Sequence, residues 1–293
     1  MAVTNPAHPE PITPRDGDQA RTGAVIALSP DGRTLAAGGL DRVGQLWDVT
    51  DLARPVPLGR PLTGHTEAIQ AVRFSPDRRT LASLDDAGTV RLWDVHDRRR
   101  AKPMGTPLTD NVQGSAALAF SPSGRTLATA GRPRSVLLWH VADPAHPPLL
   151  VELNGHNGSV QSVAFTPDGR TLASAASDGA VRLWELAPGQ WSKPLGQPLT
   201  GHAGTVKALA ISHDGRLLAT GGYDQQIHLW DITHPTRPTV TERPLATLPE
   251  RVWTLAFSPD DSVQTICAAI ARALTPDTWN RHLSGLEFDP PCH

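Results

Sequence analysis

The chain has 293 residues, enough for one or two domains with a sizeable hydrophobic core. Its 27 basic and 29 acidic residues leave a net charge of −2, which excludes the strong positive field of a general nucleic-acid or anionic-membrane binder. Two cysteines are too few for a disulfide framework, and no apolar run approaches the ~18 residues of a membrane span.

Residues 1–20 carry four prolines and almost no apolar periodicity. This composition predicts a flexible leader rather than part of a packed core. The segment also lacks the charged start and apolar centre that are typical of a signal peptide. We therefore expect the folded region to begin near residue 21.

A repeated unit then extends to about residue 260. Each copy carries a tryptophan near its end, and these tryptophans are spaced by 46, 46, 45 and 46 residues. A fixed period of this size predicts a repeat architecture. The copies end near Trp47, Trp93, Trp139, Trp184 and Trp230, and a partial sixth begins at Arg251.

The fourth unit is the most complete copy. Residues 160–165, 171–175, 180–186 and 195–199 read as four short strands, because they have strand-like composition and turn signals separate them. One such signal is Asp168-Gly169, a dipeptide typical of tight hairpins. Four antiparallel strands cannot bury both faces of a sheet alone, so neighbouring units must stack, which predicts a propeller.

The unit resembles the WD40 repeat. It carries Gly-His, a strand ending in Phe-Ser-Pro-Asp-Gly, then Leu-Ala-Ser, and finally Val-Arg-Leu-Trp-Asp, with variations between copies. The resemblance covers roughly residues 22–260. It implies an all-β fold, a WD40 β-propeller at 21–260 with five complete four-stranded blades and a truncated sixth.

The period of the sequence changes after residue 260. Between residues 263 and 274, apolar residues fall at i, i+3, i+4, i+7, i+8 and i+11, the stripe of an amphipathic helix. Thr275-Pro276 then reads as the start of a second short helix. We therefore expect residues 261–293 to form a short α-helical tail, in which free thiols at Cys267 and Cys292 are favoured over a disulfide between them.

The WD40 resemblance implies a polar network inside each blade. In the family, the His of Gly-His bonds a Ser or Thr of the second strand, that hydroxyl meets the Trp indole, and an Asp of the following turn completes the network. Unit two has Ala87 in place of this Asp, and units one and three keep only Asp41 with Trp47 and Thr129 with Trp139. The complete sets are His156, Ser174, Asp178 and Trp184 in unit four, and His202, Thr220, Asp224 and Trp230 in unit five.

We expect no catalytic residue, no metal and no cofactor. The recurring histidines fall in different units, so they are not expected to converge on a metal ion. Turn aspartates such as Asp41, Asp85, Asp86 and Asp178 resemble calcium ligands, but aspartates also recur in turns for backbone reasons. The sequence contains no nucleophile-elbow, zinc-protease or Cys-x-x-Cys motif. We interpret the run 98–100, three arginines, as a solvated connector rather than a nucleic-acid contact.

The Pro-rich connectors before Gly64-His65 and Gly201-His202, together with motifs near Trp279 and Cys292, resemble bacterial WD40 proteins of actinobacterial type. In such proteins the propeller commonly follows an NTPase of the STAND signalling class or a kinase. The present sequence contains neither a phosphate-binding P-loop nor a kinase motif set.

The resemblance also implies a binding face. In similar WD40 proteins, partners often dock where the turns between second and third strands lie. Tyr223 and Trp253 are of special interest there, because aromatic residues and arginine dominate interface hot spots. An alternative for Trp253 is that it packs under the helical tail. The positions that map to this face are Lys207, Tyr223, Arg251, Trp253, Gln70, Asp86, Arg132 and Gln161.

These observations favour a non-catalytic scaffold or sensor of a bacterial signalling system that binds other proteins. Two alternatives stay open at this point: a small-ligand sensor with a pocket at the channel mouth, and a propeller enzyme. We expect a cytoplasmic location, no nucleic-acid partner and no membrane insertion.

Overall fold

The computed structural model describes residues 25–52, 54–109, 117–131, 134–186, 192–240 and 244–257. The leader predicted at 1–20 and the helices predicted beyond residue 261 lie outside these residues. The chain divides between Glu152 and Leu153 into two compact units. Within the described ranges, no helix is long and apolar enough to cross a membrane.

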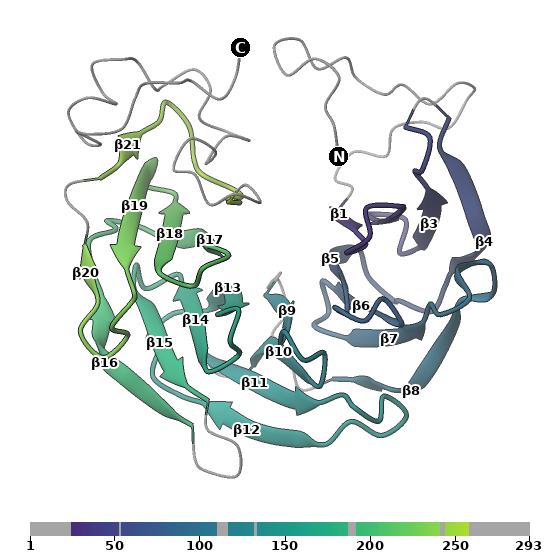
Figure 1. The fold of residues 1–293 in the computed structure, drawn as a ribbon, viewed down its shortest axis with the longest axis horizontal. Coiled ribbons are helices and arrows are strands. Elements are labelled where there is room, and N and C mark those ends of the chain that lie inside the picture. The colour runs from purple at the N-terminus through teal and green to yellow at the C-terminus, as the bar shows by residue number, and fades with distance from the viewer. Residues whose placement is uncertain are drawn as a thin grey trace. The chain divides into compact units, whose positions relative to one another are not determined.

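Five antiparallel sheets make up the described structure, and in four of them the strands follow chain order from one edge to the other (Figure 1). Blade one consists of β1 (Val25–Leu28), β2 (Thr34–Gly38), β3 (Gly44–Asp48) and β4 (Val56–Leu62). Blade two consists of β5 (Ile69–Phe74), β6 (Thr80–Asp85), β7 (Val90–Asp94) and β8 (Lys102–Leu108). Blade three consists of β9 (Leu118–Phe120), β10 (Thr126–Gly131), β11 (Ser135–His140) and β12 (Leu149–Leu153). Blade four consists of β13 (Val160–Phe165), β14 (Thr171–Ala176), β15 (Val181–Glu185) and β16 (Lys193–Leu199).

Blade five departs from the other sheets at its outer edge. It contains β17 (Val206–Ile211), β18 (Leu217–Gly222) and β19 (Gln226–Asp231) in order. The outer edge is split between β20 (Thr239–Val240) and β21 (Ala246–Thr247), and both pair with β19. The four strands predicted for the fourth unit are confirmed as β13–β16, so the expected all-β WD40 β-propeller fold is confirmed.

The second strands of the blades lie in the core. Every residue of β14 is buried, and its neighbours β13 and β15 pair with it along nearly their full length. In the register, Leu172 lies opposite Trp184 and Ser174 lies opposite Arg182. Because both faces of this strand are buried, it leaves no room for large polar side chains, and the Leu-Ala-Ser motif contains none.

The first hairpin of each blade closes with a polar turn. In blade four the Thr166 hydroxyl donates to Asp168 at 2.6 Å and accepts from the Thr171 N–H at 3.0 Å, while Gly169 adopts φ of +70°. Blade two has Arg78 where the other blades have the glycine of this turn. The same turn nevertheless forms, with Arg78 in the left-handed region at φ of +65°.

The outer strands β4, β8 and β16 share an unusual composition. Each has two prolines and, between them, a glycine with positive φ. In β4, a Cβ on Gly59 would lie 2.6 Å from the carbonyl oxygen of Arg99, so only glycine permits this approach. The segment that approaches is the 3-10 turn η1 (Arg98–Arg100), capped by Asp97, whose carboxylate accepts from the Arg99 N–H. The arginine run therefore lies against β4, yet none of its residues is buried and Arg99 and Arg100 are exposed, in agreement with the predicted solvated connector.

Residues 251–257 form a partial sixth blade against blade five. The sixth unit predicted from Arg251 contributes no strand within the described residues. The Val252 N–H donates to the Gly222 carbonyl at 3.0 Å, and its side chain is buried in the same cluster as Ala208 and Ile227. In the same way, the Ile69 N–H of blade two donates to the Gly39 carbonyl of blade one at 3.0 Å. Val252 thus takes the place that an inner-strand residue takes in a complete blade.

Candidate functional site

Blade four brings its four predicted network residues into one chain of hydrogen bonds. The Trp184 indole donates to the Ser174 hydroxyl at 2.8 Å. The Ser174 oxygen lies 2.7 Å from His156 Nε2, and His156 Nδ1 lies 3.2 Å from Asp178 Oδ2. Ser174, Trp184 and His156 are buried. These bonds connect the second strand, the third strand and the following turn, so they fix the hairpin from inside.

The protonation states of this chain follow from what each group can donate. A carboxylate only accepts, so Nδ1 of His156 carries the proton directed at Asp178, and Nε2 accepts the Ser174 hydroxyl. Burial lowers the pKa of His156, although Asp178 opposes this, and the ring is neutral at pH 7. Burial alone would raise the pKa of Asp178, but hydrogen bonds from the Asn157 and Ala180 N–H groups outweigh it and hold that pKa below its usual value.

Blade five repeats the arrangement with threonine as the hydroxyl residue. The Trp230 indole donates to Thr220 Oγ1 at 2.9 Å, and that oxygen lies 2.9 Å from His202 Nε2. His202 Nδ1 lies 2.8 Å from Asp224 Oδ2, which also accepts from the Ala203 N–H at 3.0 Å. Burial lowers the pKa of His202, as it does for the histidine of blade four.

Blade two also has a complete network, so the prediction that Ala87 leaves it without its carboxylate is wrong. Asp85, the last residue of β6, takes this role: its Oδ2 lies 2.9 Å from His65 Nδ1. The other oxygen of Asp85 accepts from the Thr89 N–H at 2.8 Å, and the side chain is fully buried. His65 Nε2 lies 2.6 Å from the Ser83 hydroxyl, which the Trp93 indole also bonds at 2.7 Å. The adjacent acids Asp85-Asp86 were the sequence signal for this substitute.

Blades one and three keep less of the network. In blade three the Trp139 indole donates to Thr129 Oγ1 at 3.0 Å, while the position of the missing His lies outside the described residues. In blade one, Ala37 stands where other blades have the hydroxyl, so Trp47 receives no hydroxyl partner from this position. Asp41 still closes its turn by accepting from the Val43 N–H at 3.4 Å.

The Ser174–His156–Asp178 chain has the same order of contacts as the triad of serine hydrolases. Catalysis needs the serine oxygen to reach a substrate carbonyl, however, and Ser174 is 0% exposed. Its oxygen already accepts from the Trp184 indole. The same holds for Ser83 and Thr220 in blades two and five, which are 2% and 0% exposed. These chains stabilise the blades and are sealed from substrates.

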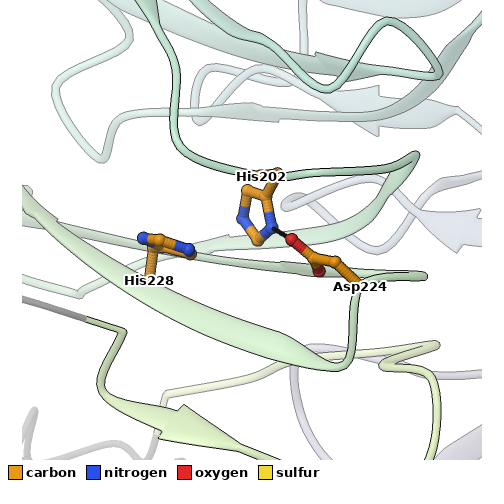
Figure 2. Close-up of side chains that lie close together, drawn as sticks. All are labelled: His202, Asp224 and His228. Atoms are coloured by element: carbon orange, nitrogen blue, oxygen red, sulfur yellow. Dashed lines mark hydrogen bonds and ion pairs between the residues drawn. The ribbon is translucent and has the colours of Figure 1, made fainter.

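One cluster in blade five has the composition of a metal site. The ligand atoms of His202, Asp224 and His228 lie within 4.8 Å of one another (Figure 2). Both ring nitrogens of His202 are already engaged, one with Asp224 and one with Thr220. His228 Nε2 lies 3.0 Å from Gln226 Oε1. A metal ion could be held here only by displacing one of the two bonds of His202, so we assign the cluster to the blade network.

His228 has a packing role that the sequence did not reveal. It lies on β19, two residues before Trp230, where blades two and four have Arg91 and Arg182. Its ring stacks on Trp230 with 5.8 Å between centroids and 20° between planes. A Cβ added to Gly201 would lie 3.3 Å from the His228 ring. Burial lowers the pKa of His228, and neighbouring His202 adds to this effect.

A second candidate site is an aromatic and cationic cluster on blade five. Tyr223 follows β18, and its ring lies 5.5 Å from the Trp253 ring at an angle of 60°. The Arg251 guanidinium lies over the Tyr223 ring, 4.6 Å from the ring centroid. Trp253 is 60% exposed, far more than the network tryptophans, although Val252 beside it is buried. The structure therefore brings together three residues that the sequence placed on the binding face.

Lys207 belongs to the same end of blade five. The backbone N–H of Tyr223 bonds the Thr205 carbonyl at 2.9 Å, which places the tyrosine at the start of β17. Lys207 Nζ donates to Gln161 Oε1 of β13 at 2.9 Å. Burial lowers the pKa of Lys207, and no carboxylate within the described ranges pairs with it.

The other predicted face residues are not brought to this cluster by any described contact. Gln70 is half-buried and Asp86 is exposed, and both belong to the first compact unit. Arg132 lies outside the described residues. The cluster named here therefore consists of Gln161, Lys207, Tyr223, Arg251 and Trp253, all in the second unit.

The comparison with protein families agrees with the fold. The model of the WD domain, G-beta repeat, matches five segments, each of which ends with the third strand of a blade: residues 18–48, 57–94, 108–140, 147–185 and 192–231. None of the curated proteins compared matches the chain. WD40 repeats generally act as scaffolds for protein–protein interaction and are typically non-catalytic. The matched segments cover more than half of the sequence, and the chain therefore belongs to the WD40 family.

Proposed function

We propose that the chain is a non-catalytic interaction module that binds a partner protein through the cluster of Tyr223, Trp253, Arg251, Lys207 and Gln161. The observation that carries this proposal is the exposure of Trp253 within an ordered contact to Tyr223. An exposed indole in ordered contact with a tyrosine and an arginine has the composition of a partner-binding site.

The cluster is rigidly mounted, which favours binding. The Val252 side chain is buried, and the Val252 backbone N–H donates to the Gly222 carbonyl, so the backbone next to Trp253 is held in place. The Arg251 guanidinium stacks on Tyr223, so neither side chain has to be ordered on association. Large rigid side chains of these types dominate interface hot spots.

The charges of the cluster favour an acidic partner segment. Lys207 and Arg251 supply two positive charges, and burial already lowers the pKa of Lys207. A carboxylate from the partner would supply the counter-ion that Lys207 lacks within the described residues. We therefore infer a partner segment with an apolar side chain for the Trp253 surface and acidic residues beside it.

We place this module in the cytoplasm, in a bacterial signalling system. Support comes from the resemblance of its connectors and tail to actinobacterial WD40 proteins, in which a STAND NTPase or kinase domain precedes the propeller. The enzyme alternative is disfavoured by the complete burial of the hydroxyls in the His-containing networks. The ligand-sensor alternative predicts saturable binding of a small molecule without a protein partner.

The test is to compare Tyr223→Ala and Trp253→Ala with the unchanged chain as bait in extracts of the native cell. We expect one partner to be lost with both variants, and its affinity to fall by about 30-fold for each, since truncating a hot spot costs about 2 kcal/mol. Leu40→Ala is the matched control, because Leu40 is 61% exposed and lies in the first unit.

Melting curves separate loss of binding from loss of fold. Both variants should melt within about 2 °C of the unchanged chain, because surface truncations change stability little. A partner retained by both variants, or a Trp253→Ala chain that no longer folds, would place the contact surface elsewhere.

A further inference from the structure

A cleft in the first unit has no role in the proposed function. Its volume is about 740 Å³, and it lies on blades one and two. The first hairpin turns of both blades line it, together with the connectors that follow β3 and β7. Five of the lining residues are arginines: Arg33, Arg78, Arg79, Arg98 and Arg99.

Two of these guanidiniums converge on one point. Arg98 Nη2 lies 2.9 Å and Arg78 Nη1 lies 3.4 Å from the same oxygen of Asp31. The other three, on Arg33, Arg79 and Arg99, have no ion-pair partner within the described residues.

The aspartates of the cleft offset most of this positive charge but not all of it. Four aspartates line the cleft, and each accepts from backbone N–H groups of its own turn or connector. Since the arginines outnumber them by five to four, the lining keeps a net positive charge. Guanidinium groups present paired donors that match the oxygens of phosphate and carboxylate.

Arg78 is held in a conformation that favours glycine. Its φ is +65°, and the equivalent turn residues of the other four blades are all glycines with φ between +70° and +73°. A side chain in this region costs roughly 1–2 kcal/mol. Its exposed ion pair with Asp31 contributes little to stability in return. Stability therefore does not explain why an arginine stands at this turn position.

A buried hydroxyl in the lining lacks a partner. Thr34 begins β2 and is 1% exposed, and its Oγ1 has no hydrogen-bond partner within the described residues. An unsatisfied buried polar group is uncommon in folded proteins and calls for a specific explanation. A ligand oxygen could satisfy it only if the surrounding side chains moved, because the Thr34 oxygen is itself sealed from solvent.

The arginines of the connector are specific to this cleft. Arg98 and Arg99 lie on η1, and the close approach of η1 to Gly59 fixes their backbone. Blade three has Pro144 and Ala145 at the equivalent positions, and blade five has Pro235 and Thr236. Repetition of the WD40 unit therefore does not account for the charge gathered here.

We propose that this cleft binds a small organic molecule with two or more phosphate groups. One phosphate would lie among Arg33, Arg79 and Arg99, and a second would compete with Asp31 for Arg78 and Arg98. Leu58 is the only large apolar residue of the lining, and no Phe, Tyr or Trp lines it. Beyond the His96 ring and the guanidinium planes, the lining offers no surface on which a base could stack, which favours a sugar polyphosphate or a similar polar skeleton over a nucleotide.

The experiment measures calorimetric binding of inorganic pyrophosphate to the full chain at constant ionic strength. We expect saturable binding that the double variant Arg79→Gln/Arg99→Gln weakens by about 100-fold, since each lost charge-assisted bond costs about tenfold. Arg125→Gln is the matched control, because Arg125 has the equivalent place in the turn of blade three and does not line the cleft. It should bind as the unchanged chain does.

A second pair of variants changes binding in opposite directions. Asp31→Asn removes the competing charge but keeps an oxygen for its turn, so it should bind pyrophosphate several-fold more tightly. Arg78→Gly should raise the melting temperature by about 2 °C, because it relieves the positive φ, and should weaken binding.

Three outcomes would overturn the proposal. The first is no pyrophosphate binding to the unchanged chain at millimolar concentration. The second is equal weakening by Arg125→Gln and by the double variant, which would show a general charge effect. The third is equal affinity for citrate, a polycarboxylate of similar charge, which would exclude a phosphate site. Loss of pyrophosphate binding leaves the test of the Tyr223 and Trp253 cluster unaffected.

Discussion

Blades two and four build the same hydrogen-bond chain with carboxylates from different positions of the repeat. In blade four the carboxylate comes from Asp178 in the turn, 22 residues after His156. In blade two it comes from Asp85 at the end of β6, 20 residues after His65. The fold therefore requires an acceptor at a point in space, which the backbone can supply from more than one residue.

The two solutions differ in burial, and this difference predicts unequal costs of removal. The Asp85 side chain is 0% exposed, whereas that of Asp178 is 12% exposed and lies nearer to water. Water can replace a lost acceptor only where it can enter. The following predictions test this comparison, from the largest expected effect to the smallest.

Asp85→Ala should lower the free energy of unfolding by about 3 kcal/mol. It leaves the His65 Nδ1–H and the Thr89 N–H without an acceptor in a buried site. Urea unfolding followed by tryptophan fluorescence measures the change. Asp86→Ala is the control, because Asp86 is exposed and should cost less than about 0.5 kcal/mol. Equal costs for the two variants would contradict the role of Asp85.

Asp178→Ala should lower the free energy of unfolding by about 2 kcal/mol, less than the blade-two change, because the site is partly open to water. Asp178→Asn should cost less again, since the amide oxygen can still accept from the Asn157 or Ala180 N–H. The same urea experiment ranks the variants. The comparison fails if Asp178→Ala is the more costly of the two alanine changes.

Acidification should destabilise the chain before any carboxylate is protonated. Burial lowers the pKa of His65, His156 and His202 from the usual 6.5 in the folded state. Below that pH the unfolded chain binds protons that the folded chain does not, so stability present above pH 6.5 is lost as the pH falls. We expect a loss of roughly 1–2 kcal/mol between pH 7.5 and 5.5 in urea titrations. Constant stability across this range would contradict neutral buried histidines.

Thr129→Val should have the smallest effect, about 1 kcal/mol, because it removes a hydroxyl but no charged group. The change removes the acceptor of the Trp139 indole while keeping the shape of the side chain. Ser174→Ala in blade four should cost more, since it breaks the bonds to both Trp184 and His156. Hydrogen exchange of the two blades provides the independent measurement: β10 should exchange faster than β14.

Much of the fold was predictable because regular spacing within the repeat marks where each strand and turn lies. The spacing of the tryptophans and the Asp-Gly turns located the blades, and the four strands of blade four were found at the predicted places. The outer edge of blade five and the segment 251–257 were less predictable. Strand pairing there depends on neighbours distant in the sequence, and propensity alone does not report them.

The networks were predictable only where the repeat is regular. Asp85 was missed because the template fixes the position of the Asp, whereas the structure fixes only where its oxygen must lie. The cleft of blades one and two was missed for a different reason: its arginines come from two turns and a connector, and nothing in the sequence shows that they converge. The contact of Tyr223 with Trp253 was anticipated because both mapped to one face.

The composition of the outer strands has a consequence for behaviour at high concentration. A proline cannot donate to a growing β-ladder, and the paired prolines of β4 and β8 interrupt their free edges at two points each. A strand of another molecule therefore cannot form a continuous ladder along these edges. By contrast, β12 has no proline and exposes Leu149 and Leu150. Intermolecular β-sheet assembly is therefore expected to start at this strand, and a lysine at Leu150 should delay the onset of light scattering on prolonged incubation.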